Sequence, residues 1–233
     1  MTTVTTPAPT DTHAPAALAA RQPFGLRIRR YLLVASPVIA AALAIAGTVA
    51  DPGTGTTGEE MNRIYTNNPD PLQWKSFLFH WSYAFWIAPA LLLAPYVRGR
   101  GRWLANVAAV LGFTGMTTMP GMLTIDYVDS AIGQIYGVAA IGEFHAFIDD
   151  SMWGLPAMLV PGLVGFALSL PVVSLALWRA GLVRWWAPAA VVAGIVAYVG
   201  SMAAVWGTCV VLVSFTVFAV ALERATRGRV PSV

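Results

Sequence analysis

Five ionisable residues stand out in a chain that is otherwise strongly apolar: His80, Asp126, Glu143, His145 and Asp149. His145 and Asp149 are four residues apart, so both project from one face if this segment is helical. Imidazole nitrogen and carboxylate oxygen are ligands of Zn²⁺ and related divalent ions, and His80 or Asp126 would complete the shell. The spacing therefore predicts His80, His145 and Asp149 as ligands of a divalent metal ion, which is the cofactor that this pattern indicates.

The same residues also permit two other interpretations. A histidine oriented by a carboxylate is the arrangement of a general base, which makes all five residues candidate catalytic groups. Acidic residues that precede a helix, such as Asp149, also stabilise its positive end without any ligand. A His-x-x-x-Asp pair is common by chance, and the sequence has no His-Glu-x-x-His zinc motif. The sequence therefore leaves enzymatic activity undecided.

Composition places these residues in a membrane protein. The chain has 233 residues, of which 57% are hydrophobic and 11% are charged, whereas soluble domains are about 25% charged. Its mean hydropathy is +0.66. Arginine supplies nearly all of the basic residues, and alanine, valine and glycine are abundant, which indicates a GC-rich bacterial gene. The positive charge flanks apolar runs and accompanies no nucleic-acid-binding motif, so we expect the lipid bilayer as the partner and no nucleic acid.

Six apolar runs predict an all-α integral membrane protein with six transmembrane helices. A helix needs about 20 apolar residues to cross a hydrocarbon core ~30 Å thick. The six runs are 31–50, 74–96, 103–123, 152–178, 185–205 and 206–222. A tight turn near Gly207 is expected between the last two, since together they are too long for one span. The first run also has signal-peptide features, with Ala44 and Ala46 in cleavage-site spacing, but it exceeds the usual ~7 to 15 apolar residues.

Charge predicts the orientation of these spans. Twelve of the 14 lysine and arginine residues fall at one set of ends, and nine of the 11 acidic residues fall at the other. Basic segments stay in the cytoplasm. The N- and C-termini are therefore predicted to be cytoplasmic, in a multi-pass protein of the cell inner (plasma) membrane.

The segments between and beyond the spans complete the predicted organisation. We expect a disordered, basic-ended cytoplasmic tail over 1–30, a transmembrane domain over 31–223 and a short basic cytoplasmic tail over 224–233. Segment 51–73 is rich in Gly, Thr, Asn and Pro, which predicts an irregular outer loop. In segment 124–151, acidic ends enclose an apolar stretch that is too short to span, which predicts an interfacial or re-entrant segment.

These features favour one function narrowly over two alternatives. The acidic outer face predicts a polar site that binds a cation, a small ligand or a membrane partner subunit. The first alternative is a membrane-embedded enzyme that acts on a lipidic or isoprenoid substrate, with the five ionisable residues around a cavity. The second alternative is a small transporter, although the two halves of the chain show no visible repeat.

Overall fold

The structure, a computed structural model, describes residues 24–227 and is all-α over that range. Residues 1–23 of the predicted tail and 228–233 of the predicted C-terminal tail lie outside the described residues. Short 3-10 turns, η1 (Ala94–Tyr96) and η2 (Gly99–Gly101), connect α3 to α4. The α-helices are α1 (Phe24–Ala50), α2 (Gly58–Asn67), α3 (Pro69–Leu93), α4 (Arg102–Met122), α5 (Thr124–Tyr136), α6 (Val138–Ser151), α7 (Gly154–Arg179), α8 (Trp186–Gly200) and α9 (Val205–Thr226).

Five helical segments in the described range are long and apolar enough to cross a membrane. They correspond to α1, α3, α4 with α5, α7 and α9, and their apolar composition suggests a membrane protein. The predicted fifth span is α8, an apolar helix of 15 residues that falls short of the ~20 residues of a typical crossing. The count of six spans therefore stays a prediction.

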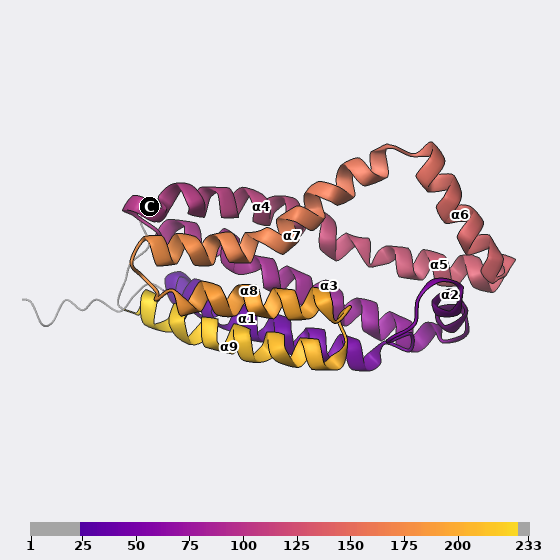
Figure 1. Ribbon diagram of the computed structural model, residues 1–233, viewed down its shortest axis with the longest axis horizontal. Helices are drawn as coiled ribbons and strands as arrows, with labels where there is room; N and C mark the ends of the chain where they lie inside the picture. Colours follow the sequence, from indigo (N-terminus) through magenta and orange to yellow (C-terminus); the bar gives the residue numbers. More distant parts are fainter. Residues whose placement is uncertain (1–23, 228–233) are drawn as a thin grey trace, which may run out of the picture.

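The long helices lie side by side, and both ends of the described chain are at the same end of this bundle (Figure 1). An ion pair between Arg30 and Glu223 joins the start of α1 to the end of α9 there. We call this end the basic end, because it holds most of the arginine residues: Arg27, Arg29, Arg30, Arg98, Arg100, Arg102, Arg179, Arg184, Arg224 and Arg227. Helices α2, α5 and α6 gather at the opposite end and form what we call the cap.

Aromatic rings form the centre of the bundle. Trp86 of α3 is almost fully buried and contacts three rings from three other helices. Its ring centroid lies 4.5 Å from Phe215 of α9, 5.0 Å from Phe166 of α7 and 5.4 Å from Tyr198 of α8. Aromatic pairs at these separations contribute stabilisation beyond that from the apolar area they bury. Trp86 therefore links α3 to α7, α8 and α9.

Glycine allows α4 and α7 to cross closely. A Cβ atom added to Gly165 of α7 would overlap the carbonyl oxygen of Leu111 and would lie 2.6 Å from the nitrogen of Gly115. A Cβ atom on Gly115 of α4 would lie 2.8 Å from the nitrogen of Phe166. Only glycine avoids these collisions with backbone atoms, which is the way small residues bring membrane helices together.

The turn between α8 and α9 is earlier than predicted. It occupies Ser201–Ala204, where Met202 and Ala203 have positive φ angles, and Gly207 lies within α9. Gly207 is needed for packing, since a Cβ atom there would overlap Ser201 Oγ and lie 2.8 Å from Ala197 O. The glycine marks the close approach of the two helices next to the turn.

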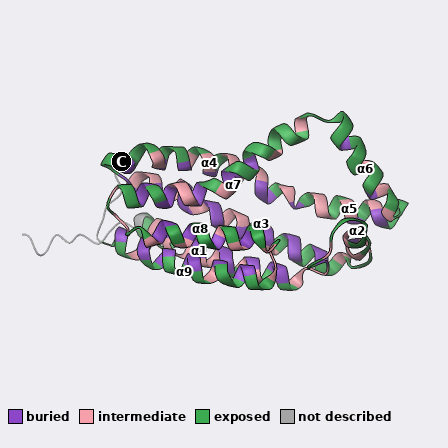
Figure 2. Cartoon of the chain, in the orientation of Figure 1, coloured by how far each residue is buried: buried purple, intermediate pink, exposed green. Residues whose placement is uncertain are grey.

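The predicted loop 51–73 is wrong for much of its length, because it contains α2 and the start of α3. Glu59 and Glu60 in the first turn of α2 favour the helix through its dipole, and Tyr65 gives it a buried side. Segment 124–151 forms two helices, α5 and α6, that meet at Gly137 with φ +94°, a conformation that suits glycine. Most of α6 and the first part of α7 are exposed (Figure 2).

Candidate functional site

A buried ion pair joins the bundle to the cap. Lys75 Nζ of α3 lies 2.8 Å from Asp126 Oδ2 of α5, and the two side chains are only 11% and 15% exposed. Ser76 Oγ donates a second hydrogen bond, of 2.7 Å, to the same carboxylate oxygen. A charge at this depth needs a partner, because removal from water costs several kcal/mol per ion. The pairing therefore ties the start of α3 to α5.

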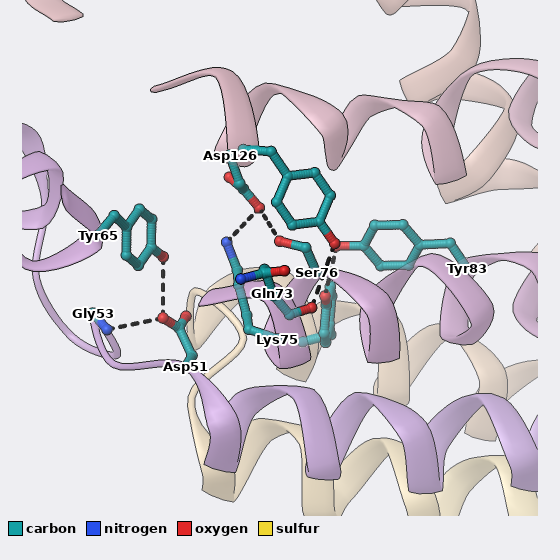
Figure 3. Close-up of polar contacts among 10 residues, drawn as sticks. Asp51, Gly53, Tyr65, Gln73, Lys75, Ser76, Tyr83 and Asp126 are labelled. Atoms are coloured by element: carbon teal, nitrogen blue, oxygen red, sulfur yellow. Dashed lines mark hydrogen bonds and ion pairs between the residues drawn. The ribbon is translucent and has the colours of Figure 1, made fainter. Parts of the chain in front are cut away.

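Tyr65 of α2 covers this ion pair. Lys75 Nζ lies 4.7 Å from the centroid of the Tyr65 ring, which is a cation–π contact. The Tyr65 hydroxyl donates to Asp51 Oδ1 at 3.1 Å, and the same oxygen accepts the Gly53 N–H at 2.9 Å (Figure 3). Burial and the nearby Asp51 carboxylate raise the pKa of Tyr65 above its ordinary value of 10.0. Tyr65 therefore stays protonated and serves as the donor.

Two further hydrogen bonds fix the cap on this cluster. Ser130 Oγ of α5 donates to the backbone oxygen of Tyr65 at 3.0 Å, and Gln134 Nε2 donates to Ser130 Oγ at the same distance. Gly133 of α5 faces Thr66 of α2 so closely that a Cβ atom would overlap its hydroxyl. Helices α2 and α5 are thus held in close contact next to the Lys75 cluster.

Beside this cluster, α3 and α5 enclose a groove made of two adjoining hollows of about 350 and 520 Å³. Gln73 and Tyr127 line both hollows, and the Tyr127 hydroxyl donates to the Gln73 carbonyl at 3.4 Å. We call this groove the α3–α5 groove. Its smaller hollow is lined by Pro69, Leu72, Gln73, Tyr127, Ser130, Ala131, Gln134 and Ile135, and its larger one by Asp70, Gln73, Trp74, Phe77 and Tyr127.

Aromatic side chains and one carboxylate dominate the larger hollow. Trp74, Phe77 and Tyr127 are 62%, 52% and 38% exposed, and the Trp74 and Phe77 rings meet edge to face at 6.1 Å. Asp70 accepts a 3.3 Å hydrogen bond from Gln73 Nε2, and no arginine or lysine of the described range pairs with it. The hollow thus combines exposed aromatic rings with a carboxylate that has no cationic partner in the described range.

The sequence-predicted site residues fall in different places. His145 of α6 lies 2.8 Å from Asp129 Oδ1 of α5, and Asp149 follows one turn later on the same helix. His80 Nδ1 lies 2.9 Å from the carbonyl oxygen of Pro120, so Nδ1 carries the hydrogen of this bond. Glu143 is exposed on α6.

The structure brings together Asp126 with Lys75 and His145 with Asp129, but it shows no bond between His80 and His145. Within residues 24–227, no group of three His, Cys, Asp or Glu side chains is placed to hold a metal ion. The divalent-metal site at His80, His145 and Asp149 stays a prediction.

Sequence reasoning named Asp126 of the cluster as a candidate but missed its partner Lys75 and the residues that line the groove. Lys75 carried a usable signal, because it is the only lysine of the chain and lies near the start of an apolar helix. Asp70, Trp74 and Tyr127 carried little signal, since a carboxylate and aromatic rings at a helix end are typical of membrane interfaces. Comparison of the chain with protein-family models, curated proteins and solved structures finds no match.

Proposed function

We propose that this protein is a six-span protein of the bacterial inner membrane, with cytoplasmic termini, that binds a small organic cation in the α3–α5 groove at its outer face. The observation that carries the proposal is the Asp70 carboxylate in one hollow with three exposed aromatic rings. Its topology and its ligand are supported by separate observations.

The position of α8 supports six spans. The turn that joins α8 to α9 lies beside the cap end of α1, because Thr48 Oγ1 donates to Ala203 O at 3.0 Å. Helix α8 begins just after Trp185 at the basic end, so it runs the length between the two ends. A short crossing of this kind is accommodated by local thinning of the bilayer. The concentration of arginine residues at the basic end supports placing that end in the cytoplasm.

The chemistry of the hollow favours a cation over other ligands. Aromatic rings attract a cation through the negative charge of their faces, and this attraction is the usual basis for binding quaternary ammonium groups. Asp70 adds a full negative charge, whereas the nearby Lys75 is already paired with Asp126. Gln73 and Gln134 supply polar contacts at the walls. The combined volume is in the range of small-ligand sites, ~300–1,000 Å³.

Equilibrium dialysis of the purified full chain with radiolabelled tetramethylammonium tests this function. We expect saturable binding of one ion per chain, unaffected by an excess of the uncharged, similarly shaped tert-butanol. Trp74→Leu should weaken binding about 2- to 30-fold, since a cation–π contact contributes about 0.5–2 kcal/mol. Asp70→Asn should weaken binding by up to about fivefold, as expected for a partly exposed charge pair.

Two control variants test whether binding is specific to the groove or is a general property of acidic and aromatic residues on the outer surface. Glu60→Gln removes an outer carboxylate on α2, and Trp153→Leu removes an 83% exposed tryptophan next to α7. Both should bind tetramethylammonium as the unmodified protein does. Equal losses in the controls and in the Trp74 and Asp70 variants would show that binding is a property of the outer surface and would reject the groove.

A further inference from the structure

A second groove lies on the opposite half of the bundle, between α1 and α9. It has a volume of about 600 Å³, and its lining comes from the middle of α1 and the C-terminal end of α9. Apolar side chains form nearly all of its wall, with Thr216 as the one uncharged polar residue. The apolar wall includes Val34, Val38, Ile39, Ala219 and Val220. We call it the α1–α9 groove.

The charges of this groove are confined to its mouth. Glu223 is bonded to Arg30 of α1, and Arg227 Nε lies 3.7 Å from the same carboxylate oxygen. Arg224 is exposed and forms no ion pair within the described part of the chain. Arg30, Arg224 and Arg227 thus outnumber Glu223 here, which leaves a net positive charge at this end of the apolar groove.

We propose that the α1–α9 groove binds an anionic phospholipid, with an acyl chain along the groove and the phosphate at Arg224 and Arg227. The apolar wall matches the acyl chain, and the net positive mouth matches the head group by charge. Basic pockets between helices at the cytoplasmic side of membranes are typical sites for anionic head groups. This site lies at the end remote from the α3–α5 groove, so the inference does not depend on the proposed cation.

The charge at the mouth distinguishes this occupant from a second copy of the chain. A second copy that placed the same face here would bring Arg224 and Arg227 toward their own counterparts, which is unfavourable. The acyl chain of a zwitterionic lipid would also fit the apolar groove, but its neutral head group would be attracted less strongly by the arginines. The proposal therefore predicts preference for anionic over zwitterionic lipid.

Native mass spectrometry of the full chain in detergent, titrated with dioleoylphosphatidylglycerol or dioleoylphosphatidylcholine, measures this preference. We expect tighter binding of the anionic lipid. Arg224→Gln with Arg227→Gln should reduce that preference by about 30-fold, which corresponds to about 1 kcal/mol for each arginine. Thr216→Trp, at an exposed position in the wall, should weaken binding of both lipids because it fills the groove. Arg179→Gln with Arg184→Gln is the matched control, since it removes two arginines at the same end outside the groove.

Competition with glycerol 3-phosphate distinguishes a lipid-binding site from a site that binds any phosphate. It should not displace the anionic lipid at equal concentration, because it lacks an acyl chain. Equal competition would overturn the proposal in favour of a free-anion site. The proposal would also be overturned by equal loss of preference in the control variant, or by a change of oligomeric mass in the Thr216 variant without loss of lipid, which would assign the groove to a second copy.

Discussion

Lys75 Nζ and Asp126 Oδ2 lie 2.8 Å apart although their residues are 51 positions apart in the chain. Through this pair the only lysine of the protein connects α3 of the bundle to α5 of the cap. Ser76 and Tyr65 complete its surroundings, so the charge is hydrogen-bonded and covered by an aromatic ring. The α3–α5 groove depends on this connection, because it fixes the two helices that form its walls.

Breaking this pair from one side should destabilise the protein strongly. Asp126→Asn leaves the Lys75 ammonium without its carboxylate, and Lys75→Met leaves the Asp126 carboxylate without its cation. Either single change should cost about 3 kcal/mol of folding free energy, because one buried charge is then unpaired. For a chain of this size that cost lowers the Tm by about 6–12 °C. Circular dichroism during heating in detergent measures the change.

The double variant and a surface pair provide the controls. Lys75→Met combined with Asp126→Asn should regain most of the lost stability, because neither charge then remains buried alone. Glu60→Gln breaks the exposed Glu60–Arg63 pair and should change stability by less than about 0.5 kcal/mol. Additive losses in the double variant would contradict a direct interaction between Lys75 and Asp126.

Tyr65 should ionise only above its ordinary pKa. Its pKa is raised in the folded protein, so its contribution to stability is fully present below pH 10.0 and is lost as the pH rises through the folded-state pKa. The near-ultraviolet absorbance of tyrosinate, recorded for the protein minus the Tyr65→Phe variant, should therefore rise only above pH 10.0. A difference signal that titrates at or below pH 10.0 would show that Tyr65 is not held in the buried donor position.

A methyl group at the α4–α7 crossing should be costly. Gly165→Ala places a Cβ atom against backbone atoms of Leu111 and Gly115, which cannot rotate away, at a cost of about 1–3 kcal/mol. Gly121→Ala on α4 is the control, since no heavy atom lies within 4 Å of its added Cβ, and it should be neutral or stabilising by up to about 1 kcal/mol. Thermal unfolding of the two variants compares them, and equal stability would argue against close contact of these helices.

Thiol labelling checks the orientation. After replacement of the exposed Cys209, cysteine at Asn67 of α2 should react with an impermeant reagent in intact cells. Cysteine at Arg100 should react only after lysis. Arg100 is preferable to its neighbour Gly99, whose φ of +65° would strain any side chain. Labelling at Arg100 in intact cells would reverse the orientation inferred from charge.

The sequence alone located the long helices, although α1 begins at Phe24 and the predicted run at residue 31. Hydrophobic runs such as 206–222 are found again in α9, Val205–Thr226, because an apolar backbone segment can satisfy its own hydrogen bonds only as a helix. Most arginines of the described range lie at helix ends that share one end of the bundle, as their positions between the runs indicated. Both signals are local, since each is carried by consecutive residues.

The tertiary structure decided what the polar residues do. His145 meets Asp129 of another helix, and Asp126 meets Lys75, because helix rotation and the bend at Gly137 determine which faces oppose each other. Asp70 and Tyr127 share a hollow for the same reason. Helix periodicity determines which residues of one helix share a face, whereas the partner of that face is selected by packing against segments far away in the chain.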